Sequence, residues 1–240
     1  MALAPLDARM AVNGSPHERQ SQSQRRAVLQ ALGGLPAALV LGVDAGAAAS
    51  ADTGASAARA ARAAPLFDGL AGHGNSIESS HPLVQLYYNQ GLMLVYGFNP
   101  AEAVRSLQAA VALDPACASA WWALAWALGP NINSDMAPGN EPLLLQALQQ
   151  ARRHAGRASP VRRALIAALS LRHPGPGLID EETYARQMQA LARRHPRDAD
   201  VALLAAEALL NLHPYDWWQP AGGPQPWTPR IEALLRQALR

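Results

Sequence analysis

The feature that most constrains the fold is a pair of helical periodicities between Pro82 and Pro115. Apolar residues recur at intervals of three and four over residues 83–95, as expected for a helix with one buried face. Asn99-Pro100 interrupts this pattern, and a second run over residues 103–113 stops before Pro115, because the residue preceding a proline avoids the helical region. The segment therefore predicts two short antiparallel helices.

The composition favours the same class of structure along the rest of the chain. Half of the 240 residues are apolar, and only 5% are aromatic. Most of the apolar residues are Ala and Leu, which prefer helices to strands. We therefore expect an all-α protein. Further helices are predicted at Ala118–Leu128, Leu143–Ala155, Val161–Arg172 (led by Ser159-Pro160), Asp180–His195 (capped by Asp180), Ala199–Leu212 and from Thr228-Pro229 to the end.

The segment from Pro82 to Pro115 resembles a tetratricopeptide repeat at the positions that define this family. The family's frame of roughly 34 residues has a large aromatic residue, small residues where the helices cross, and a terminating proline. Small side chains are needed at the crossings because packed helix axes lie only about 8–10 Å apart. The matching residues are Tyr87, Gly91, Ala103, Leu107, Ala110 and Pro115, and one frame later Trp121 and Ala125.

This resemblance implies a right-handed α-solenoid of tetratricopeptide-like helix hairpins over residues 66–240. The same region is similar to a group of long bacterial tetratricopeptide proteins of undefined activity. Members of that group continue through further repeats, including a histidine-containing helix that this sequence lacks. Neither the expected terminating proline nor a polar capping helix follows the last helix. We therefore expect the chain to be truncated at its C-terminus.

The first 51 residues have the layout of a signal peptide. Arg25-Arg26 precedes an apolar stretch, residues 31–43, and Ala49-Ser50-Ala51 supplies a cleavage site. The paired arginines resemble a twin-arginine export signal. The apolar stretch is too short to span a hydrocarbon layer of about 30 Å. The sequence therefore predicts a periplasmic or secreted protein without a stable membrane span, with residues 52–65 as a flexible linker; a cytoplasmic protein with an alanine-rich leader is the alternative.

Charge and cysteine content limit the possible partners. All 20 cationic residues are Arg, against 18 acidic residues, which gives a net charge of +2. A near-balanced charge argues against a nucleic-acid partner, because such a partner requires a basic stripe. The single cysteine, Cys117, has no second cysteine with which to form a disulfide, and we expect it to be a small buried residue rather than a nucleophile.

The candidate binding residues follow from the tetratricopeptide resemblance, in which the first helix of each hairpin lines a concave groove. On this frame the groove wall is aromatic and uncharged, and it suits a protein or peptide partner. The competing interpretation is that Trp122 and Trp126, four residues apart on one helix, pack against the irregular loop that follows and the predicted helix over residues 143–155. The residues so assigned are Gln85, Tyr88, Asn89, Leu92, Val95, Ser119, Trp122 and Trp126.

Polar candidates outside this wall are few. Asn131 and Asn133 are candidate ligand residues, although asparagines beside Gly-Pro are more often turn formers. The seven histidines lack metal-binding spacing, so we expect no metal and no cofactor. His173, His195 and His213 each precede a proline at a helix end, where an imidazolium would complement the helix dipole.

These patterns favour an exported scaffold that binds a protein or peptide and has no catalytic activity of its own. Catalytic motifs such as a phosphate-binding glycine loop or a nucleophile elbow are missing from the sequence. Two alternatives stay open: a metal- or cofactor-dependent exported enzyme, and a fragment of a longer tetratricopeptide protein that is not functional alone.

Overall fold

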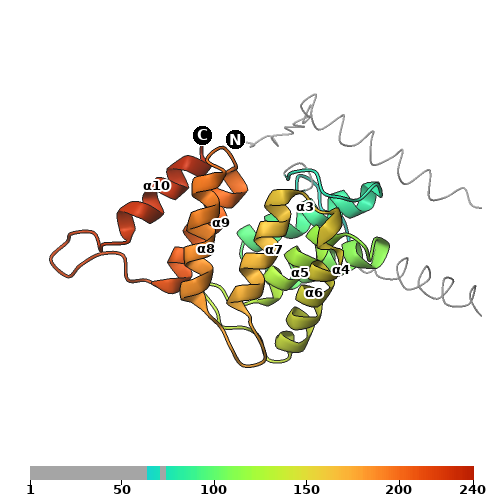
Figure 1. Cartoon of the computed structure of the whole chain (residues 1–240), viewed down its shortest axis with the longest axis horizontal. Helices are drawn as coiled ribbons and strands as arrows, with labels where there is room; N and C mark the ends of the chain where they lie inside the picture. The colour runs from blue at the N-terminus through green and yellow to red at the C-terminus, as the bar shows by residue number, and fades with distance from the viewer. Residues whose placement is uncertain (1–63, 71–73) are drawn as a thin grey trace, which may run out of the picture. The chain divides into compact units, whose positions relative to one another are not determined.

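The computed structural model describes residues 64–70 and 74–240, all of which fall within one compact unit. Over these ranges the chain is all-α, with isolated bridges in three loops and no β-strand (Figure 1). The helices are Pro82–Tyr96 (α3), Pro100–Leu113 (α4), Ala118–Leu128 (α5), Asn140–His154 (α6), Pro160–Arg172 (α7), Glu181–Arg194 (α8), Ala199–Leu212 (α9) and Thr228–Ala238 (α10), with a 3-10 turn at Ala155–Arg157.

Side-chain caps explain why the helices begin where the sequence predicts. The side chains of Asn99, Ser159, Asp180 and Asp198 each accept a hydrogen bond from the backbone amide three residues later. Such caps satisfy amides that have no partner within the helix. The largest difference is at α6, which begins at Asn140 rather than at Leu143, because a proline is tolerated in the first turn of a helix.

Each helix packs against the next one along the chain, and α5 also contacts α3 and α7. The crossing of α3 and α4 is close. A Cβ atom added to Gly91 would lie 2.5 Å from Cγ of Leu107, whose side chain is fully buried. Ala103 and Ala110 of α4 are fully buried as well. Small residues thus lie where the two helices approach most closely.

The packed part of the chain begins earlier than residue 66. Ala64 is buried, and its carbonyl accepts a hydrogen bond from the Tyr87 hydroxyl at 2.9 Å. The Gln90 side chain donates to the carbonyl of Pro65 at 2.8 Å and accepts from the amide of Phe67 at 2.7 Å. Residues 64–67 therefore pack on α3. The signal peptide and the rest of the predicted linker lie outside the described residues.

Among residues 64–70 and 74–240, no helix is both long enough and apolar enough to cross a bilayer.

Candidate functional site

The side chains predicted to line the groove are mostly in the interior. Tyr88, Leu92 and Trp122 are 0%, 1% and 2% exposed, and Ser119 is fully buried. Trp122 stacks on Trp126, with ring centroids 5.9 Å apart. An open aromatic wall is therefore not formed by these residues. The two tryptophans are buried inside the protein, with Tyr96 of α3 and Arg162 of α7 among their neighbours.

Residues from α7 and α9 cover this wall. The Arg162 guanidinium of α7 lies 5.5 Å from the ring centre of Tyr88 and 5.8 Å from that of Trp122. Arg162 is also 3.9 Å from a carboxylate oxygen of Asp200 on α9, and both side chains are buried. A cation over aromatic faces with a carboxylate beside it is a favourable arrangement away from water. The positions of residues in the tetratricopeptide frame predict which side chains form the wall. They do not predict which later helix covers that wall.

Gln85 and Asn89 hold the segment before α3 in place. The Gln85 amide nitrogen donates to Oδ1 of Asn89 at 2.7 Å and to the carbonyl of Asn75 at 3.2 Å. Its oxygen accepts from the amide of Ile77 at 3.1 Å. Both polar groups of Gln85 are therefore engaged within the protein.

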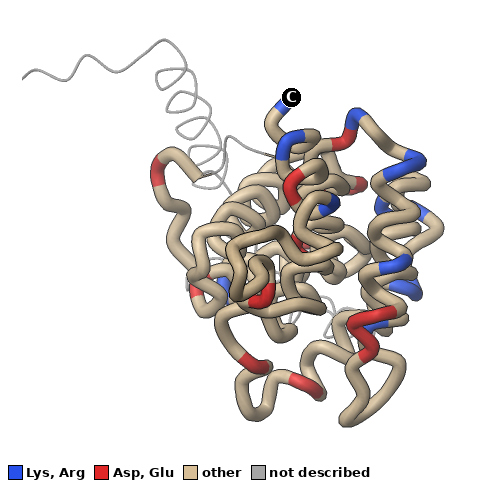
Figure 2. Tube along the Cα trace, turned by 90° about the vertical axis from the view of Figure 1, so that its left-hand side faces the viewer, with Lys and Arg blue, Asp and Glu red and all other residues tan. Residues whose placement is uncertain are grey.

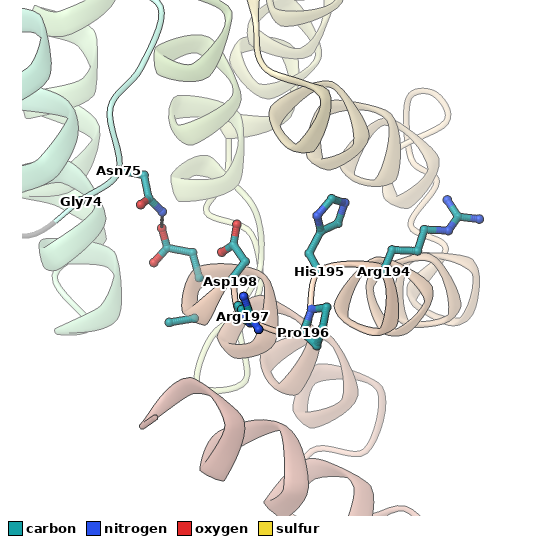
Figure 3. Close-up of a pocket in the computed structure, with 9 residues that line it drawn as sticks. Gly74, Asn75, Arg194, His195, Pro196, Arg197 and Asp198 are labelled. Carbon is teal, nitrogen blue, oxygen red and sulfur yellow. Dashed lines mark hydrogen bonds between the residues drawn. The ribbon is translucent and has the colours of Figure 1, made fainter.

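A hollow of about 690 Å³ lies between this segment and the turn that joins α8 to α9. Figure 3 shows Asn75 hydrogen-bonded to Asp200, at 2.9 Å, and Arg194 pointing away from them. Asp198 caps α9 at the amide of Val201. The carboxylates of this hollow are thus used to hold the fold together, so the hollow is not the candidate site.

A smaller and more enclosed cavity, of about 230 Å³, is the better candidate. We call it the α5 pocket, because the end of α5 and the loop after it form one wall. Most of its lining is apolar, with α9 and α10 opposite α5. The lining residues are Val95, Tyr96, Phe98, Pro100, Trp126, Ala127, Gly129, Pro130, Asn131, Ile132, Leu203, Glu207, Leu210 and Leu235. Of the predicted binding residues, the pocket brings together Val95, Trp126 and Asn131.

Phe98 projects at the edge of this pocket. It is 63% exposed and has a φ of 55°, in the left-handed region that bulky residues rarely adopt. The turn is held by two backbone hydrogen bonds, from the amide of Phe98 to the carbonyl of Val95 and from Asn99 to Leu94. A strained backbone that presents an exposed ring beside a cavity is a feature typical of binding sites.

Glu207 is the one carboxylic acid that lines the pocket. Its Oε1 accepts a hydrogen bond from the Asn211 side chain at 2.8 Å. Its Oε2 is enclosed and forms no hydrogen bond within the described residues. Burial raises the pKa of Glu207, and this outweighs the opposing effects of Arg172, Asn211 and the Trp126 indole. The pocket therefore combines an apolar lining with one acid group that lacks a full set of partners.

The neighbouring charges are already paired. Arg172 of α7 is 1% exposed and binds both carboxylate oxygens of Glu181, with a shortest distance of 2.7 Å. It also donates to the carbonyl of Pro130 at 3.1 Å, and its guanidinium lies 5.1 Å from the ring centre of Tyr184. Acidic and basic residues both occur along the trace (Figure 2). Among the described residues that line the pocket, Glu207 is the carboxylic acid.

Asn131 and Asn133 occupy a turn. The side-chain oxygen of Asn131 accepts from the amide of Asn133 at 2.9 Å, and the backbones of Asn131 and Ser134 exchange two hydrogen bonds. The side-chain oxygen of Asn133 accepts from the hydroxyl of Tyr215 at 2.6 Å. The turn-former interpretation accounts for both asparagines, while Asn131 still contributes to the pocket wall.

The sequence predicts the environment of Cys117 correctly but not that of His173. Cys117 is fully buried, as expected, and burial raises the pKa of its thiol to about 12. His173 was expected to be an imidazolium. Instead it is 5% exposed, and burial together with Arg172 lowers its pKa to about 4. It is therefore neutral at pH 7, because the loss of hydration outweighs the attraction of the helix end.

Within residues 64–70 and 74–240, no three His, Cys, Asp or Glu side chains lie close enough together to hold a metal ion.

Comparison with known proteins adds no relative to this description. No protein-family model matches the chain, and no curated protein or solved structure matches it either. The tetratricopeptide resemblance rests on the residues of this sequence alone.

Glu207 is the functional candidate that sequence reasoning missed. Its signal was present, because it is a lone acid within the Ala- and Leu-rich stretch of α9. Neither the helical periodicity nor the repeat frame shows that Glu207 faces a cavity at the end of α5, because α5 and α9 are far apart in the sequence.

Proposed function

We propose that this protein is a binding scaffold, a right-handed α-solenoid of tetratricopeptide-like hairpins, that holds an extended segment of a partner protein. The observation that supports the proposal is the α5 pocket: an apolar cavity with an exposed aromatic ring at its edge. Ligand sites are typically concave and apolar with a few polar groups, and usually measure about 300–1,000 Å³ for drug-sized ligands. At about 230 Å³ this cavity suits one side chain of a peptide.

The contacts of α5 with both α3 and α7 support the solenoid part of the proposal, because stacked hairpins bring the first helices of successive repeats together. Because the predicted groove wall is buried, the proposed binding site differs from the predicted one. The partner is held at the end of the hairpins, where Val95, Trp126 and Asn131 line the pocket, rather than along the buried face of Tyr88 and Trp122.

Binding of a peptide panel tests this function. Dye-labelled peptides of random sequence are selected against the purified protein and their affinity is measured by fluorescence anisotropy. We expect Leu235→Arg, which places a positive charge in the apolar wall of the pocket, to weaken binding at least tenfold. Leu239→Arg is the matched control, since Leu239 is 88% exposed and does not line the pocket. Equal loss in both variants, or no selectable peptide, would contradict the proposal.

We also propose that the protein is exported by the twin-arginine route, so that binding takes place in the periplasm or outside the cell. The support is the layout of the first 51 residues. Expression in a bacterial host followed by intact-mass measurement of the periplasmic fraction tests it. A mature N-terminus near Asp52 is expected, and an Arg25→Lys, Arg26→Lys double variant should retain the leader in the cytoplasm.

A further inference from the structure

The charge balance around the α5 pocket is uneven. Arg172 is paired with Glu181, and Arg162 is paired with Asp200. Glu207 has no ion pair within the described residues, and one of its oxygens has no hydrogen bond. Arg172 is the cation that acts on Glu207 most strongly, but it is also the ion-pair partner of Glu181, so these three described residues have two carboxyl groups for one cation. A partly buried acid in such a group either retains its proton or is stabilised by a further positive charge.

The groups that face Glu207 come from every element around it. Arg172 of α7 attracts the carboxylate more strongly than Glu181 of α8 repels it, and the Asn211 amide and the Trp126 indole also favour the charged form. Tyr184 of α8 and Tyr96 of α3 lie near enough for Glu207 to raise the pKa of each. Among the described residues, none of these groups donates a hydrogen bond to Oε2 of Glu207.

The apolar side of the pocket also suits a cation. Tyr96, Phe98 and Trp126 all line it, and the Tyr96 and Trp126 rings meet edge to face with centroids 5.5 Å apart. Aromatic rings attract ammonium and guanidinium groups, and aromatic cages are a common means of holding them. Leu203, Leu210 and Leu235 offer contacts for an aliphatic stem.

We propose that the side chain held in the α5 pocket is basic, a lysine or arginine of the partner, whose stem packs on the aromatic and leucine side chains and whose charge meets Glu207. The proposal rests on the proposed function, since it names the residue class that the pocket takes. The protein contains no lysine of its own, so a lysine at this site would come from another protein.

The test compares stems of similar length with different end groups. Blocked pentapeptides with a central Lys, Arg, norleucine or Glu in a Gly/Ser background are labelled and titrated by anisotropy at pH 7.5. We expect the Lys and Arg peptides to bind at least tenfold more tightly than the norleucine peptide, and the Glu peptide not to bind. In Glu207→Gln, the Lys peptide should bind no more tightly than norleucine, while norleucine binding is unchanged.

Glu232→Gln is the matched control, because Glu232 lies on the exposed part of α10 and pairs only with Arg236. This variant should keep the full preference for Lys. If the norleucine peptide binds as tightly as the Lys peptide to the unmodified protein, the proposal that the pocket takes a basic side chain is wrong. In that case, loss of binding in Leu235→Arg would still support peptide binding. If none of these pentapeptides binds although selected peptides of the random panel do, the proposal of a basic side chain fails while peptide binding stands.

A second measurement works even if Glu207→Gln does not fold. A bound cation favours the carboxylate, so binding of the Lys peptide should release a proton that Glu207 holds in the free protein, at a pH between the free and bound pKa values. Calorimetric titrations at a series of pH values between 4.5 and 7.5, in two buffers of different ionisation enthalpy, measure this release directly. Proton release with Lys and none with norleucine is expected within this series; no release with either peptide at any of these pH values would contradict the role of Glu207.

Discussion

Trp122 belongs to the interior of this protein. It is 2% exposed, stacks on Trp126 and lies beneath the guanidinium of Arg162. We expect Trp122→Ala to lower the free energy of unfolding by about 3–5 kcal/mol, because it removes a buried ring and leaves a cavity. Urea denaturation followed by circular dichroism measures the change.

Trp218→Ala is the matched control for that measurement. Trp218 is 63% exposed, and we expect its loss to change stability by no more than about 0.5 kcal/mol. Equal destabilisation by the two substitutions would show that the burial of Trp122 is not what stabilises the hairpins.

Phe98, unlike Trp122, is largely exposed and has a strained backbone. Because its φ is 55° and its ring is largely exposed, Phe98→Gly relieves backbone strain while removing little buried surface. We expect stability to stay equal or to rise by up to about 1 kcal/mol, and peptide affinity at the α5 pocket to fall. Thermal unfolding and anisotropy on the same preparation check both effects. A loss of stability of more than about 1 kcal/mol would mean that the ring is chiefly a packing residue.

At the scale of elements, α7 has a double task. It follows α6 in the array, and through Arg162 it covers the aromatic face of α3 and α5. Its first turn is fixed by Ser159, whose hydroxyl accepts from the amide of Arg162 at 3.3 Å. The cap and the covering side chain thus depend on the same turn.

We therefore expect Ser159→Ala to cost about 1 kcal/mol, as is usual for the loss of a helix cap. Hydrogen exchange should increase first at the amides of the opening turn of α7, residues 160–163. Ser159→Asp should restore protection, since a carboxylate is an equally good cap. Unchanged exchange in the alanine variant would argue that packing alone positions the helix start.

The helices themselves were predictable because the residues at their own ends determine where they begin and stop. Proline or an acidic or hydroxyl cap marks most of the starts, and α5, α9 and the end of α7 agree with the predicted bounds. The exception, α6, follows Gly139, whose φ of 85° shows only in the folded backbone. Local rules therefore determine which residues are helical.

The candidate site was predictable only in part. Val95 and Trp126 were identified from their place in the repeat frame, and Asn131 was identified as a polar residue beside Gly129-Pro130; all three line the α5 pocket. The burial of Tyr88 and the role of Glu207 were not, because both depend on α7 and α9 returning to pack near α3 and α5. Periodicity within a helix contains no information about such distant pairings.

At the scale of the whole molecule, His173 couples stability to pH. Its pKa is about 4 in the folded protein and about 6.5 in the unfolded chain. Between these values the unfolded chain binds a proton that the folded protein does not, so stability falls as the pH is lowered from about 6.5 to about 4. Above this window the effect vanishes. Allowing for partial solvent screening, we expect a loss of about 2 kcal/mol.

Urea denaturation of the unmodified protein and of His173→Gln, at intervals between pH 7 and pH 4.5, measures this dependence. The variant should show a flatter decline, because glutamine cannot take up a proton. Glu207 acts in the other direction, since a raised pKa makes the folded protein lose stability as the pH rises above about 4.5. Parallel curves for the two proteins would exclude His173 as the cause.

The hydrogen bond from Asn75 to Asp200 joins residues 125 positions apart. During synthesis at about 5–20 residues per second, the two ends of that bond emerge on the order of ten seconds apart. Arg162 emerges in the later part of that interval, and Asp200, its partner, emerges only at the end. Until α9 has been made, the nascent chain therefore exposes an incompletely covered aromatic face on α3 and α5 to chaperones, proteases and other unfinished chains.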